Sequence, residues 1–154
     1  MKNLILLLLT TSFFCSSCNN DDDNDELVTS QEFIIKELNN SGINGTATFE
    51  KFSSGQIIVS LTLSGTESEK SYTANIYNNS ITEDGDIAIS VGAINGEFGT
   101  GAHIISNLDY QDPNTPATPI TYEELIQFDG HIKILNNDNE SIIIAAGNIG
   151  SNAK

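Results

Sequence analysis

The clearest pattern in the chain is TATFEKF at 46–52, SSG at 53–55 and QIIVSLTLS at 56–64. In the last segment Ile57, Val59, Leu61 and Leu63 alternate with Ile58, Ser60 and Thr62, so one face is apolar and the other mostly polar. This alternation is typical of a strand with one buried face. The Ser-Ser-Gly triplet is a turn signal between two such runs. Residues 46–64 are therefore predicted to form a β-hairpin.

Working outward from this hairpin, short apolar runs separated by Gly, Asn, Ser and Asp predict further strands. They lie at 33–38, where the pattern alone also fits a helical turn, and at 71–77, 87–94, 103–108, 131–135 and 141–149. A proline-containing loop covers 111–119. One helix is expected near 121–128, because Thr121 and Glu124 have the spacing of a capping box and Gly130 follows. The fold class is thus all-β, an antiparallel Greek-key β-sandwich of about seven to eight strands with one short helix.

The N-terminal residues have the pattern of a bacterial signal peptide. Lys2 precedes the apolar run at 4–9, which is shorter than the roughly 20 residues that a membrane span needs. Ser16-Ser17 then come before Cys18. This resembles the lipobox of lipoproteins, although Cys15 stands where a leucine is usual. We expect cleavage after residue 17 and lipidation of Cys18. The alternative is a signal peptide cut elsewhere, with Cys18 as a free or disulfide-bonded thiol.

An acidic segment follows the expected lipidation site. Asn19 to Glu26 contains no apolar residue, so residues 18–30 are predicted to be a flexible tether. Its Asp21, Asp22 and Asp23 resemble the acidic export signal of surface lipoproteins. A solvated spacer without any targeting role is the other interpretation. We therefore expect a lipid-anchored outer-membrane protein displayed on the cell surface, with the periplasmic face as the alternative.

The charge balance excludes one class of partner. The chain has 6 basic and 21 acidic residues, a formal net charge of −15, and no tryptophan. Such a surface repels phosphates, so nucleic-acid binding is not expected.

Residues 45–150 resemble the CHRD domain, a module of secreted proteins. The similarity is carried by DIAIS at 86–90, by Asn95-Gly96, by ITYEEL at 120–125 with Phe128-Asp129-Gly130, and by AAGNIG at 145–150. CHRD domains in turn resemble Cu,Zn superoxide dismutases. The resemblance implies a Greek-key sandwich for the domain at 31–154, and it does not imply an activity.

The metal ligands of that resemblance are missing. Where the family often has two histidines on one strand, this chain has Asn75 and Tyr77, an amide and a phenol that bind copper or zinc poorly. The only two histidines, His103 and His131, fall on separate strands and are interpreted as hydrogen-bonded or solvent-facing. No metal and no cofactor are expected.

No catalytic motif is evident either. Glu123 and Glu124 are neighbours on the predicted helix, so their carboxylates diverge. The sequence therefore favours a non-catalytic binding or structural module with an unknown protein or glycan partner. Two alternatives stay open. One is a metal-binding or dismutase-related enzyme on the same scaffold. The other is a calcium-assisted adhesion module that uses loop carboxylates, from Glu83, Asp84, Asp86, Asp109 and Asp112.

Overall fold

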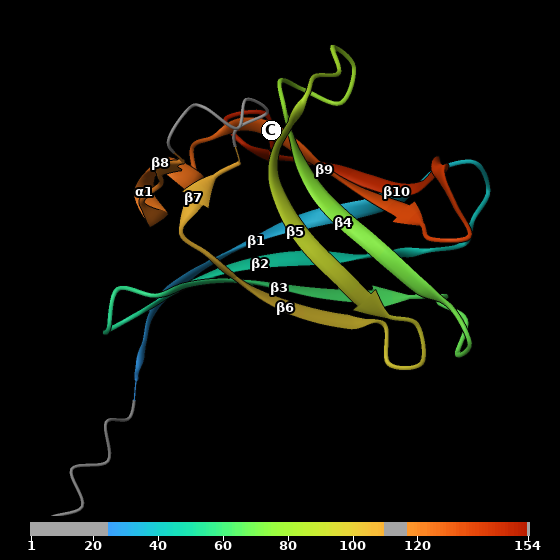
Figure 1. Ribbon diagram of the computed structural model, residues 1–154, viewed down its shortest axis with the longest axis horizontal. Helices are drawn as coiled ribbons and strands as arrows, with labels where there is room; N and C mark the ends of the chain where they lie inside the picture. The colour runs from blue at the N-terminus through green and yellow to red at the C-terminus, as the bar shows by residue number, and fades with distance from the viewer. Residues whose placement is uncertain (1–24, 110–116, 154) are drawn as a thin grey trace, which may run out of the picture.

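A computed structural model describes residues 25–109 and 117–153. Eight antiparallel strands form a closed barrel (Figure 1). These are β1 (Leu27–Glu37), β2 (Asn44–Phe52), β3 (Ile57–Ser64), β4 (Ser71–Asn78), β5 (Ile87–Asn95), β6 (Thr100–Ile105), β9 (Asp129–Asn136) and β10 (Asn139–Gly150). A two-stranded sheet of β7 (Asn107–Leu108) and β8 (Thr118–Pro119) lies with the helix α1 (Tyr122–Leu125) beside one end of the barrel.

The strand order around the barrel is β1-β10-β9-β4-β5-β6-β3-β2. Strands β4, β5 and β6 follow one another as neighbours, and β6 then lies beside β3. This arrangement of β3 to β6 is a Greek key. The prediction of an antiparallel all-β domain with one short helix is confirmed. The strands form a single closed barrel where the sequence predicted two facing sheets. Alternation shows which face is buried, and it does not show whether the outer strands meet.

The predicted hairpin is confirmed as β2 and β3, which pair from Asn44↔Ser64 to Lys51↔Ile57. The four alternating residues of β3 are all buried inside the barrel. They pack in one core with inward-facing residues of the other strands, among them Phe49, Tyr72, Ile76, Ile94, Ile132, Ile134 and Ile149. Burial of these apolar side chains is the main source of stability.

The first strand starts earlier than the sequence predicted. β1 begins at Leu27 and pairs with β2 from Leu27↔Phe52 to Ile35↔Gly45, so residues 27–30, assigned to the tether, belong to the barrel. Asp25, which precedes this strand, is held in place by hydrogen bonds. Its carboxylate accepts hydrogen bonds from Ser54 N and Oγ, at 2.8 and 2.6 Å, and from Ser53 Oγ at 3.1 Å. The first described residue is thus attached to the β2–β3 turn.

The predicted capping box is confirmed, since Thr121 caps α1 and the Glu124 carboxylate accepts the Thr121 backbone N–H at 2.9 Å. The helix is shorter than expected and ends at the C-cap Ile126, while Gly130 already belongs to β9. Residues 118–119, predicted as loop, form β8 because they pair with β7. The remainder of that predicted loop, from 111 to 116, lies outside the described residues.

Two ladders of the barrel are short. β1 and β10 pair only at Lys36↔Ala146 and Glu37↔Ala145, and β5 and β6 pair only at Asn95↔Thr100. At the second short ladder the His103 ring bridges the strands, because its Nε2 is 2.9 Å from the Ala93 carbonyl oxygen. At both places, much of the backbone of the two neighbouring strands is outside the strand-to-strand ladder.

Candidate functional site

The outer face of β4 carries the two positions that correspond to metal ligands in the resembled family. Tyr72, Ala74 and Ile76 point into the core. Alternation therefore places Asn75 and Tyr77 together on the outer face. Asn75 is nevertheless 9% exposed, so something covers this part of the barrel surface.

The neighbouring strand β9 adds two further polar side chains. The register pairs Tyr77 with His131 and Asn75 with Lys133. The Tyr77 and His131 rings are stacked, with centroids 5.4 Å apart and an interplanar angle of 17°. Lys133 Nζ lies 4.2 Å from the centroid of the Tyr77 ring, a cation–π geometry. We call these four residues the outer polar cluster.

The loop between β4 and β5, residues 79–86, closes over this cluster. The Lys133 ammonium donates to Asp84 Oδ1 at 2.5 Å, and His131 Nδ1 is 2.8 Å from the Asn79 carbonyl oxygen. Asn79 and Asp84 both have positive φ, +66° and +61°, which these two residue types adopt more readily than most others. Asn79 Nδ2 also donates to the Asp84 carbonyl at 2.9 Å. The loop conformation thus brings one carboxylate onto the ammonium.

His131 is the most buried polar residue of the cluster, with none of its surface exposed. A carbonyl oxygen can only accept, so Nδ1 carries the hydrogen and Nε2 has the lone pair of the neutral ring. Nε2 is buried without a hydrogen-bond partner and lies 3.8 Å from Asp84 Oδ1. Burial lowers the pKa of His131, and the positive charge of Lys133 adds to this effect. The Asn79 carbonyl and Asp84 oppose it.

Asp84 is exposed, yet it is tied to the cluster. The hydrogen bond from Lys133 lowers the pKa of this carboxyl most strongly. The Gly85 backbone N–H and the charge of Lys133 lower it further. Asp84 therefore stays ionised and supplies the negative charge beside a buried ammonium. The arrangement of the cluster is that of an internal ion pair which holds a loop.

The sequence pattern identifies Asn75 and Tyr77 and does not identify the residues beside them. The alternation of β9 places His131 and Lys133 on one face. Which strand lies next to β9, and in which register, is not encoded in a local pattern. His131 is hydrogen-bonded, which agrees with the interpretation made for it, and its contact with Tyr77 was not foreseen.

The other candidate residues are dispersed. His103 contacts β5, as described above. The Glu83 carboxylate accepts a hydrogen bond from Ser80 Oγ at 2.6 Å. Glu123 forms an ion pair with Lys51 at 2.6 Å, apart from the capping role of Glu124. Asp109 accepts the Ser90 backbone N–H. The positions Cys18, Asp21, Asp22, Asp23 and Asp112 lie outside the described residues.

The donor set does not fit the copper or zinc that the dismutase resemblance would imply. Around the two β4 positions it consists of an amide, a phenol, one imidazole and a carboxylate already paired with an ammonium. Within 25–109 and 117–153, no group of three or more His, Cys, Asp or Glu side chains could hold a metal ion.

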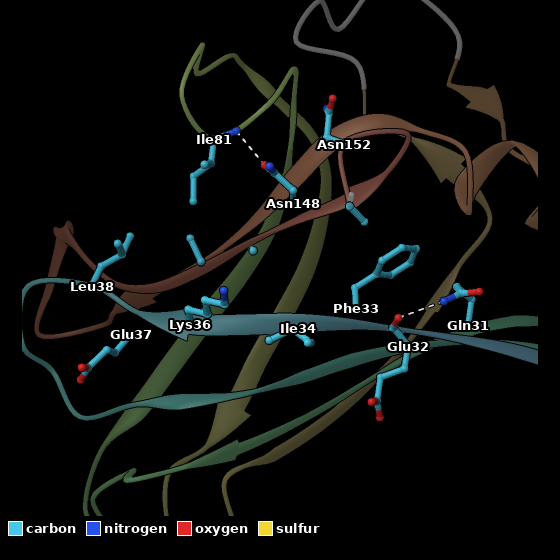
Figure 2. Close-up of a pocket in the computed structure, with 13 residues that line it drawn as sticks. Gln31, Glu32, Phe33, Ile34, Lys36, Glu37, Leu38, Ile81, Asn148 and Asn152 are labelled. Atoms are coloured by element: carbon cyan, nitrogen blue, oxygen red, sulfur yellow. Dashed lines mark hydrogen bonds between the residues drawn. The ribbon is translucent and has the colours of Figure 1, made fainter.

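A second surface feature lies beside β1. A groove of about 660 Å³ opens next to the short β1–β10 ladder (Figure 2). Ile34 and Lys36 line one side, and Ala146 and Asn148 of β10 line the other. Ile81 of the loop over the polar cluster reaches the same groove, because its backbone N–H donates to Asn148 Oδ1 at 2.9 Å. The groove and the polar cluster therefore share one loop.

The fold defines the described chain as an antiparallel Greek-key barrel with one short helix. A scan against protein-family models finds no match, and no curated protein matches the sequence. Among the helices of the described residues, none is long and apolar enough to cross a membrane.

Proposed function

We propose that this protein is a non-catalytic binding or structural module, held on a bacterial outer membrane by lipid on Cys18 and displayed at the cell surface. The observation that carries the proposal is the junction between the acidic segment and the barrel. Asp25 is hydrogen-bonded to Ser53 and Ser54, and β1 begins two residues later. A spacer ending at such a junction would hold the domain at a defined point of its first strand.

The chemistry of the outer polar cluster supports the non-catalytic part of the proposal. A positive charge is already present there, as the Lys133 ammonium, and the nearest carboxylate is bonded to it. A divalent cation placed beside Lys133 would be repelled. The cluster is suited to fixing the loop at 79–86, which also forms a wall of the groove.

The proposed relationship to CHRD domains is supported by topology. Strands β3 to β6 form the Greek key that this resemblance leads one to expect, and Asn75 and Tyr77 share the outer face of one strand. Similar topology is compatible with many functions, so the relationship supports a fold and not an activity.

Mass spectrometry of the mature N-terminus tests the anchor. We expect a diacylated Cys18, and incorporation of a labelled fatty acid that is lost in Cys18→Ala. An unmodified amino end at any other residue would contradict the proposal. Protease treatment of intact cells tests the display. Digestion of the domain before lysis supports surface exposure, and protection until lysis places it on the periplasmic side.

A metal-related function is the alternative, and the donor set around His131 argues against it. The lone pair of His131 Nε2 is buried, lacks a hydrogen-bond partner and lies near a carboxylate. Metal analysis after mild purification decides between the two. One equivalent of a transition metal per chain, lost in His131→Phe, would favour the metal-related function over a binding module.

A further inference from the structure

A short stripe on the outer face of β1 has an unusual order of side chains. Phe33 and Ile35 point into the core, so Glu32, Ile34 and Lys36 project outward from the same strand. Along the strand the stripe runs from negative to apolar to positive. Successive members are about 7 Å apart. The stripe therefore has opposite charges at equal distances from a central isoleucine.

These side chains have no partners within the described chain. Lys51, Lys70 and Lys133 each pair with a carboxylate, so Lys36 is the one lysine in 25–109 and 117–153 without an ion pair. Glu32 also forms no ion pair there, and Ile34 is 63% exposed. An unpaired lysine is notable in a protein with 21 acidic residues.

The stripe also forms one edge of the groove beside β10. Ile34 and Lys36 line it together with Ile81, Ala146, Asn148 and Ala153. This row of side chains thus lies directly beside a depression whose lining is partly apolar and partly polar. A two-fold axis that passes through this row brings it against the same row of a second copy, in the opposite direction.

We propose that this surface binds a second copy of the chain. A two-fold axis at Ile34 reverses the stripe. Glu32 of each copy then faces Lys36 of its partner, and the two Ile34 side chains meet at the centre. The contact forms two ion pairs around an apolar core. Two chains of net charge −15 repel one another elsewhere, so the pairing of opposite charges selects this orientation.

This charge pattern indicates which binding partner fits the surface. A strongly basic or strongly acidic partner segment would be attracted by one charge of the stripe and repelled by the other. Only a partner with the reversed order of charges satisfies both ends, and the same surface turned by a two-fold axis has that order. The contact is small, so we expect a reversible dimer. This inference goes beyond the proposed function and does not require the lipid anchor.

Zero-length carbodiimide cross-linking of the purified full chain in a mild detergent tests the dimer. Within one extended strand, residues four apart are separated by about 13 Å, too far for a direct amide link. A cross-linked peptide that joins Glu32 to Lys36 can therefore only come from two copies. We expect this peptide in a covalent dimer. Its absence at concentrations where other copy-to-copy links form would overturn the proposal.

Charge-swap variants supply the control. Lys36→Glu should weaken dimerisation about tenfold in sedimentation experiments, because like charges then meet twice. The double variant Glu32→Lys/Lys36→Glu restores opposite charges and should recover the dimer. Lys70→Glu changes the net charge equally and removes only the Lys70–Glu67 ion pair, so it should dimerise normally. Equal weakening by Lys36→Glu and Lys70→Glu, or no recovery in the double variant, would contradict the pairing.

Discussion

The two members of the Lys133–Asp84 ion pair differ in their exposure. The Lys133 side chain is 9% exposed and that of Asp84 is 67% exposed. Removing the carboxylate therefore leaves a buried ammonium with its main partner gone. Removing the ammonium leaves a carboxylate that water can solvate. The energetic consequences of the two changes should be unequal.

We expect Asp84→Asn to lower the free energy of unfolding by about 1–3 kcal/mol, and Lys133→Met to lower it by less. Asparagine tolerates the positive φ at this position, so Asp84→Asn changes charge and not backbone conformation. Methionine keeps most of the apolar stem of Lys133. Urea denaturation of both variants measures the difference. A larger loss of unfolding free energy in Lys133→Met than in Asp84→Asn would contradict the expectation that the buried ammonium depends on its carboxylate partner.

Stability should also decrease in mild acid because of His131. Its pKa is lowered from 6.5 in the folded protein, chiefly by burial, so below that pH the unfolded chain binds more protons. The stability linked to neutral His131 is then fully present above pH 6.5. It falls as the pH drops toward the pKa of His131 in the folded protein. Urea midpoints between about pH 8 and pH 5.5 measure this slope, which His131→Phe should reduce. The pKa of Asp84 is lowered from 3.8, so its contribution is lost only in stronger acid.

For individual residues, the sequence predicted which of them share a face of a strand. It did not predict which residues of other strands they contact. Asn75 and Tyr77 follow from alternation within one strand. Their contacts with Lys133 and His131 depend on residues 54 or more positions away, and on a register set by the whole barrel. The loop contact of Asp84 depends in addition on two residues with positive φ.

The short β5–β6 ladder depends on a glycine. Gly92 has φ +133°, and an added Cβ would lie 2.5 Å from His103 Cε1. Gly92→Ala should therefore destabilise the barrel by more than the strain of the backbone alone, by about 2–4 kcal/mol. Gly55→Ala is the matched control, because its φ is +88° and nothing lies within 4 Å of the new Cβ. Thermal unfolding should show the larger decrease in Tm for Gly92→Ala.

Elements were predicted better than the lengths of their ladders. Hairpins such as β2–β3 depend on local alternation and a turn, and both are visible in the sequence. The helix start was predicted because a capping box is also local. The closure of β1 on β10 joins residues more than a hundred positions apart. Such a contact is decided by packing of the complete core, which explains why a barrel was not predicted.

For the molecule as a whole, the attachment of Asp25 to the β2–β3 turn fixes the segment that leads into β1. Hydrogen bonds from Ser54 lower the pKa of Asp25, so the attachment is present above 3.8 and weakens as the pH falls through the folded value. Asp25→Asn should weaken it at neutral pH. Hydrogen exchange should then accelerate at the Ser54 amide, which donates to Asp25 Oδ1, and stay unchanged at β9. Unchanged exchange at the turn would mean that Glu26 alone holds it, through its backbone bonds with Ser53.

The pairing of β1 with β2 also determines how the barrel responds to mechanical load. The ladder contains eight residue pairs, and its hydrogen bonds run across the strand direction. Tension applied to the chain ahead of Asp25 acts along β1. All the bonds of the ladder then resist sliding together, and they do not open one after another from an end. A domain suspended from its first strand in this way withstands drag from its surroundings better than one suspended from a peeling edge.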